Sequence, residues 1–99
     1  MAGGPPSRRR LRGRGMSAVI LPFPRSRDRQ FIRRHAAHMA QARTAAKAEA
    51  HLARQLGIQA ETLQRRGVLP DVARGELQAI EGNIRAACWT LLLAPGGAA

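Results

Sequence analysis

The sequence predicts an all-α protein: a small three-helix bundle built on an antiparallel helix hairpin, with a disordered, arginine-rich N-terminus. Between residues 26 and 94, apolar side chains recur every three or four positions, as along one face of a helix, and no stretch alternates as a strand does. A turn at residues 67–70, which contains a glycine and a proline, divides two of the helical stretches. The length of 99 residues allows one small domain.

Residues 1–16 are predicted to form a disordered basic tail, because Gly, Pro, Ser and Arg make up most of them. Met16 begins a stretch that reads like a natural protein start. Residues 1–15 are therefore either a functional tail or sequence upstream of the true start. They hold five arginines, and their removal would lower the formal net charge from +11 to +6.

Residues 17–25 are predicted to form an extended apolar strap. Pro22 and Pro24, with one residue between them, exclude a helix there. We favour a strap in which Ile20 and Phe23 fold back to cover the helices, because exposed apolar runs are liabilities. The alternative is a linear docking motif for a partner protein.

The helical domain is expected to cover residues 26–94. Its first helix begins at Ser26, which can cap it, and has Asp28 in the first turn. Thr44 is the expected N-cap of a second helix that ends at Gly67, since glycine suits the left-handed position after a helix. The apolar face of the first helix is Phe31, Ile32, His35, Met39 and Ala42, and that of the second is Ala48, Leu52, Leu56 and Leu63.

The third helix is expected to begin with Pro70 at its first position and to end before Pro95, which leaves residues 95–99 as a flexible tail. Gly75 and Gly82 lie opposite its apolar face and are expected to be exposed. The second and third helices should pair as an antiparallel hairpin on which the first helix packs. The apolar face of the third helix is Ala73, Leu77, Ile80, Ile84, Ala87, Cys88 and Leu91.

Residues 51–66 are similar to a helix-turn-helix, with Gly57 at the turn and apolar anchors around it. In that interpretation Gln59, Gln64 and the neighbouring Arg65 approach DNA, although Arg66 stands where a buried apolar residue is expected. The alternative is one continuous helix with an interior glycine, at a cost of about 1 kcal/mol. We favour the continuous helix, because the motif match is loose.

Sixteen of the seventeen basic residues are arginine, and the chain contains six acidic residues. The arginines at the N-terminal end of the chain could follow a phosphate backbone without reading its sequence. They could equally be a solvated basic face. The candidate nucleic-acid contacts outside the helix-turn-helix segment are Arg25, Arg27, Arg29, Arg33 and Arg34.

The sequence offers no basis for catalysis, and we expect a protein that is not an enzyme and has no cofactor. The acidic residues are scattered singly, and no nucleophile motif or phosphate loop is present. His35 and His38 lie one helical turn apart, but nothing in the sequence places His51 or Cys88 beside them, so we expect no metal site. His35 is expected to be partly buried at the edge of the core.

The compartment is expected to be the cytoplasm. A single cysteine, Cys88, excludes an internal disulfide. No apolar run approaches the roughly 20 residues of a membrane span. The arginine pair at Arg8 and Arg9 is not followed by the long apolar region of an export signal.

Five stretches carry a family resemblance: LPFP at 21–24, FIRRHAAHMA at 31–40, HLARQL at 51–56, ETLQRRGV at 61–68 and IRAACWTLLLAPGGAA at 84–99. From Leu21 to Ala99, the chain resembles a family of small, basic, helical bacterial proteins known only as a domain of unknown function. The resemblance implies a helical fold and supports Met16 as the usual start. It carries over no catalytic or binding residue.

These observations favour a protein-interaction or self-associating module. A core of this size often gains stability by association, so a homodimer or a complex with another protein is expected, with no membrane contact. The alternative is a nucleic-acid binder that uses residues 51–66 or non-specific arginine–phosphate contacts. The candidate interaction surface comprises Ile20, Phe23, Trp89 and Leu92.

Overall fold

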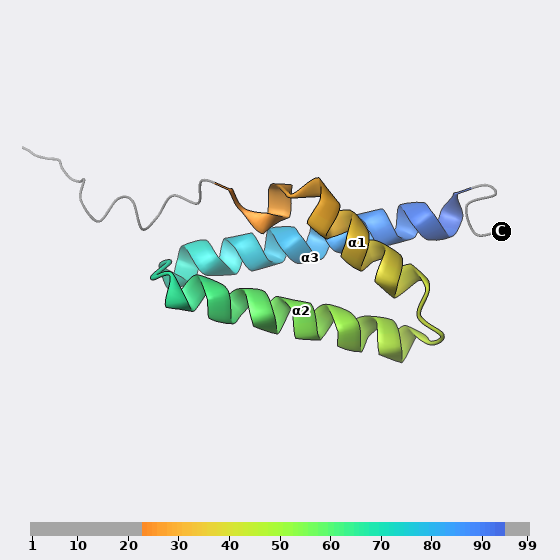
Figure 1. The fold of residues 1–99 in the computed structure, drawn as a ribbon, viewed down its shortest axis with the longest axis horizontal. Coiled ribbons are helices and arrows are strands. Elements are labelled where there is room, and N and C mark those ends of the chain that lie inside the picture. Colours follow the sequence, from red (N-terminus) through yellow and green to blue (C-terminus); the bar gives the residue numbers. More distant parts are fainter. Residues whose placement is uncertain (1–22, 95–99) are drawn as a thin grey trace, which may run out of the picture.

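The computed structural model describes residues 23–94. A short 3-10 turn, η2 (Arg25–Arg27), leads into α1 (Arg29–Ala40), α2 (Ala45–Arg65) and α3 (Pro70–Leu93). Figure 1 shows α2 and α3 side by side as an antiparallel hairpin, with α1 lying across α3. The predicted all-α, three-helix architecture is confirmed, and no strand occurs in residues 23–94. The predictions for residues 1–16, 17–22 and 95–99 lie outside the described part of the chain.

The predicted start of α1 is wrong. Asp28, not Ser26, is the N-cap, and its Oδ1 accepts a hydrogen bond from the backbone N–H of Phe31 at 3.0 Å. Ser26 lies in η2, where its backbone N–H and its hydroxyl both donate to the carboxylate of Glu76 at 2.8 Å. Its hydroxyl is therefore occupied by a partner on α3 and does not cap α1. The predicted end of the strap at residue 25 is also wrong, because Arg25 belongs to η2.

The core lies where α1 crosses the hairpin. Its members largely follow the predicted apolar faces, and His35 is half-buried at its edge, as predicted. Leu91 is an exception, because it is 38% exposed. The core cluster consists of Phe31, Ile32, Ala36, Met39, Leu52, Ile80, Ile84 and Cys88.

The predicted helix boundaries at Thr44 and Gly67 are confirmed. The Thr44 hydroxyl accepts a hydrogen bond from the backbone N–H of Lys47 at 3.1 Å, which caps α2. At the other end, Gly67 has a φ of 77° and the N–H of Val68 donates to the carbonyl of Leu63 at 3.0 Å. This is the left-handed ending for which glycine is preferred.

Helix α2 continues through Gly57 without a break, as we favoured from the sequence. Gly57 is exposed, and a Cβ atom placed on it would meet no atom within 4 Å. The helix-turn-helix interpretation of residues 51–66 is therefore wrong, because that motif needs two helices at an angle with a turn between them.

We predict that Gly57→Ala raises the free energy of unfolding by about 1 kcal/mol, since alanine is the better helix former and has room there. Gly67→Ala provides the matched control. It should lower the free energy of unfolding by about 1 kcal/mol or more, because a Cβ is strained at positive φ. Urea unfolding followed by circular dichroism measures both. Destabilisation by Gly57→Ala would contradict a continuous helix.

Candidate functional site

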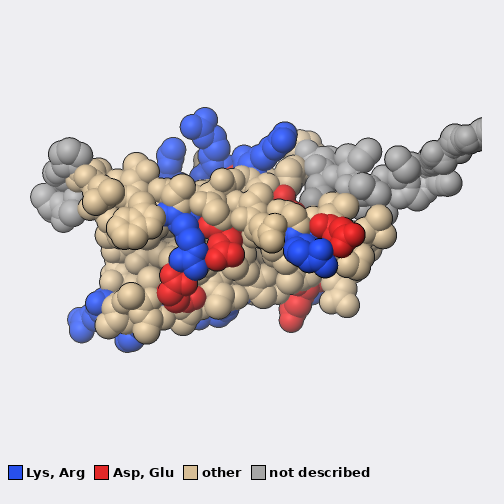
Figure 2. Space-filling view, turned by 180° about the vertical axis from the view of Figure 1, so that it is seen from behind, with Lys and Arg blue, Asp and Glu red and all other residues tan. Residues whose placement is uncertain are grey.

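Four arginines of the sequence prediction lie together. Arg27 of η2 and Arg29, Arg33 and Arg34 of α1 are all exposed. Figure 2 shows basic side chains projecting along the upper edge of the molecule, where η2 and α1 lie, whereas the face below carries acidic and basic groups side by side. None of the four takes part in an ion pair within residues 23–94.

Three of these arginines line a groove of about 440 Å³ between α1 and α3, which we call the arginine groove. Arg27, Arg29 and Arg33 contribute to its lining. Its other polar residues are Ser26, Asn83 and Thr90, and its apolar residues are Ile32, Ala87 and Leu91.

Arg25 has a structural role that sets it apart from the other arginines. Its Nη1 donates to Oδ2 of Asp28 at 2.6 Å, and its guanidinium lies 5.0 Å from the ring centroid of Phe31. The hydrogen bond from the backbone of Phe31, with that from Arg25, lowers the pKa of Asp28. Arg25 thus helps to hold the N-cap of α1 in its charged, accepting form.

The structure does not bring the α2 residues of the prediction to these arginines. Gln64 and Arg65 are exposed in the last turn of α2, and Arg65 donates to the hydroxyl of Thr62 at 3.4 Å. Gln59 instead faces a pocket between η2, α2 and α3. With the helix-turn-helix excluded, the nucleic-acid hypothesis depends on the arginines of η2 and α1.

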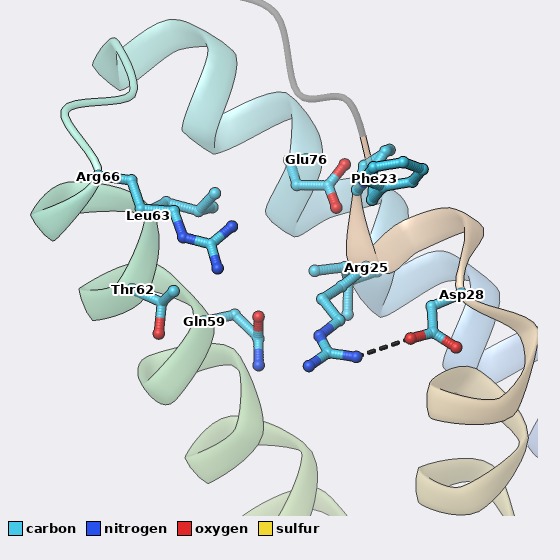
Figure 3. A pocket seen from close by; sticks show the side chains of 10 residues that line it. Phe23, Arg25, Asp28, Gln59, Thr62, Leu63, Arg66 and Glu76 are labelled. Carbon is cyan, nitrogen blue, oxygen red and sulfur yellow. Dashed lines mark hydrogen bonds and ion pairs between the residues drawn. The ribbon is translucent and has the colours of Figure 1, made fainter. Parts of the chain in front are cut away.

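The pocket beside Gln59 has a volume of about 410 Å³ and a polar lining. Figure 3 shows the guanidinium groups of Arg25 and Arg66 and the amide of Gln59 pointing into it. Glu76, which is 9% exposed, lies at its wall and accepts both hydrogen bonds from Ser26. The lining carries two guanidinium groups, of Arg25 and Arg66, and two carboxylates, of Asp28 and Glu76. These charges sum to zero, so the pocket does not select for an anion.

The sequence analysis did not identify Arg66 and Glu76 as site residues. Arg66 did give one signal: it is a charged residue at a position where a helix-turn-helix requires an apolar side chain. Glu76 gave no signal, because its partner Ser26 lies 50 residues away in the chain.

Three histidines meet at the junction of α1 and α2. Nδ1 of His35 and Nε2 of His51 lie 2.9 Å apart, and the ring of His38 stacks on that of His51 with centroids 3.8 Å apart. The sequence did not place His51 there. Within residues 23–94 no group of three His, Cys, Asp or Glu side chains is arranged to hold a metal ion.

The histidine pair favours the uncharged state. Burial, followed by the charges of His51 and Arg34, lowers the pKa of His35. Burial, followed by the charges of His38 and Arg54, lowers the pKa of His51. An imidazole–imidazole hydrogen bond also needs one nitrogen without a proton, so double protonation removes this hydrogen bond between α1 and α2.

A second groove, of about 300 Å³, lies between the α1–α2 loop and the end of α3. Trp89 and Leu92, two residues of the predicted interaction surface, line it and are 61% and 46% exposed. Leu93 beside them is 73% exposed. We call this groove, with the exposed side chains of Trp89, Leu92 and Leu93, the Trp89 surface. Its other apolar lining residues include Met39, Ala42, Ala48 and Cys88.

The other two residues of the predicted interaction surface do not join Trp89 and Leu92. Ile20 lies outside the described residues. Phe23 lines the polar pocket instead (Figure 3), and it is 92% exposed, so the prediction that it covers the helices is wrong.

Residues 16–99 match the model of a family of unknown function, DUF6074. The chain belongs to this family. Comparison with curated proteins gave no match, and neither did comparison with solved structures. None of the helices in residues 23–94 has the length and hydropathy needed to cross a membrane.

We predict that the protein loses stability as the pH falls. The unfolded chain, whose histidines titrate near pH 6.5, binds protons that the folded histidine pair resists. The stability contributed by the pair is therefore fully present above about pH 7 and is lost as the pH falls through about 6.5 towards the lowered folded pKa values. Urea unfolding at a series of pH values measures this loss.

His35→Gln keeps a hydrogen-bonding group beside His51 and should make the free energy of unfolding less dependent on pH. His38→Gln is the control, because His38 stacks on His51 without joining the 2.9 Å contact, and its effect should be smaller. If the free energy of unfolding depends equally on pH in the wild type and in His35→Gln, the His35–His51 pair is not the source of the pH dependence.

Proposed function

We propose that this protein is a non-enzymatic self-association module that forms a homodimer through the Trp89 surface. One observation carries the proposal: Trp89, Leu92 and Leu93, three large apolar side chains at the end of α3, are 61%, 46% and 73% exposed. Large apolar side chains that are exposed together mark an interaction surface. In residues 23–94, no element covers this end of α3.

The shape of the Trp89 surface suits a second copy of the same chain. The exposed indole of Trp89 stands beside the 300 Å³ groove that it helps to line, so a projection and a hollow lie on one face. A twofold dimer needs such a self-complementary face, because each copy then offers its projection to the hollow of the other.

The charge around this surface also favours a second copy. Arg85 donates to both carboxylate oxygens of Glu49 at 2.7 and 2.8 Å and to Glu81 at 3.1 Å. Arg43 also lines the groove. The charges of Arg43, Arg85, Glu49 and Glu81 therefore sum to zero. Two chains that each carry +11 repel one another least where such neutral faces meet.

The small core is consistent with association. The core cluster contains eight buried residues, one of them an alanine. Domains with so little buried apolar surface are marginally stable alone and gain stability from oligomerisation.

We expect the full chain to show twice the monomer mass in sedimentation equilibrium at high protein concentration. Leu92→Glu should weaken the dimer by about tenfold or more, because it places a charge at an apolar contact. Ile58→Glu is a matched control: Ile58 is also 46% exposed, but lies on α2 outside the groove, so the dimer should persist. Circular dichroism verifies that both variants fold.

Two results would overturn the proposal. One is a wild-type chain that stays monomeric at every concentration tested. The other is a dimer that Leu92→Glu and Ile58→Glu weaken to the same extent, since the contact would then lie elsewhere.

A further inference from the structure

We propose that the arginine groove binds an acidic amphipathic helix of another protein. This site goes beyond the proposed dimer, because it occupies a different side of α3: Thr90 and Leu91 line the arginine groove, whereas Trp89 and Leu92 line the other groove. A dimer formed through the Trp89 surface would leave the arginine groove of each copy open.

The arginines of the groove occupy positions that are unfavourable for the isolated domain. Arg29 is the first residue of α1, where a positive charge opposes the helix dipole, and the N-cap carboxylate beside it, Asp28, is already bonded to Arg25. Arg29 and Arg33 lie four residues apart on one helix, a spacing at which like charges repel. Negative groups from a partner would relieve both effects, so the groove is complementary to an anionic ligand.

The lining contains an apolar part that distinguishes protein from nucleic acid. Ile32, Ala87 and Leu91 contribute to it, and Leu91 is 38% exposed. A phosphate backbone has no apolar side to place against these residues. An amphipathic helix has one, and it can lay its apolar face between α1 and α3 while its acidic residues reach Arg27, Arg29 and Arg33.

A second copy of this chain does not supply that ligand. The chain contains six acidic residues, and five of them already accept hydrogen bonds from their own chain. Only Glu61 forms no such bond within residues 23–94. The five are Asp28, Glu49, Asp71, Glu76 and Glu81.

The test is fluorescence anisotropy with the full chain and a labelled peptide helix that has leucines on one face and glutamates on the other. A scrambled peptide of the same composition and a duplex DNA are the comparison probes. Near physiological salt, the amphipathic peptide should bind about tenfold or more tightly than the scrambled one.

Arg29→Glu and Arg33→Glu should each weaken peptide binding by about tenfold, because they reverse a charge that contacts the ligand. Arg54→Glu is the matched control: it makes the same charge change on the exposed face of α2, and binding should change by no more than about twofold. Leu91→Ser should weaken binding of the peptide but not of DNA.

Three outcomes would overturn the inference. Equal binding of the two peptides would show attraction by charge alone. Tighter binding of the duplex, with a steep salt dependence and no effect of Leu91→Ser, would identify a phosphate-binding surface instead. An equal loss with Arg54→Glu would show that the groove is not the binding site.

Discussion

The contact between Glu76 and Ser26 determines how the N-terminal part of the fold is placed. Glu76 lies on α3 with 9% of its surface exposed, and a buried carboxylate is costly unless its oxygens are hydrogen-bonded. Ser26 satisfies both oxygens, and Asn83, two turns further along α3, donates to the carbonyl of Ser26 at 2.8 Å. These bonds hold η2 against α3. They thereby set where Asp28 can begin α1 and which side of α3 the arginines of α1 overlie.

Helix α3 separates two surfaces of different chemistry. Residues one position apart on a helix point about 100° away from each other, so Leu91 and Leu92 belong to different grooves. On one side, Arg85 is neutralised by Glu49 and Glu81, and the surface is apolar. On the other, Arg27, Arg29 and Arg33 have no acidic partner within residues 23–94. One helix therefore contributes to a neutral surface on one side and to a charged surface on the other.

The sequence predicts the helices well because their signals are local. Thr44 caps α2, Gly67 adopts the left-handed conformation, and the apolar spacing along α3 identifies Ile80 and Ile84 as core residues. The start of α1 was predicted wrongly because Ser26 is held by Glu76, which is distant in sequence. Local patterns contain no information about such a partner.

The candidate site also combines features that local sequence predicts with features that depend on how the helices pack. The sequence named Trp89, Leu92, Arg29 and Arg33 as candidates by their residue types; the first two line one groove and the other two line the other. The grooves themselves could not be predicted, because they depend on the angle at which α1 crosses α3. The histidine contact was missed for the same reason: His35 and His51 lie on different helices, and only their packing joins them.

The position of Trp89 has a spectroscopic consequence. It is the only tryptophan in a chain without tyrosine, so it accounts for nearly all of the near-ultraviolet emission. Its indole is already 61% exposed in the folded monomer, so unfolding changes its surroundings little. Tryptophan emission is therefore a poor measure of folding for the monomer. For the same reason, a blue shift reports that the indole of Trp89 at the end of α3 has become covered.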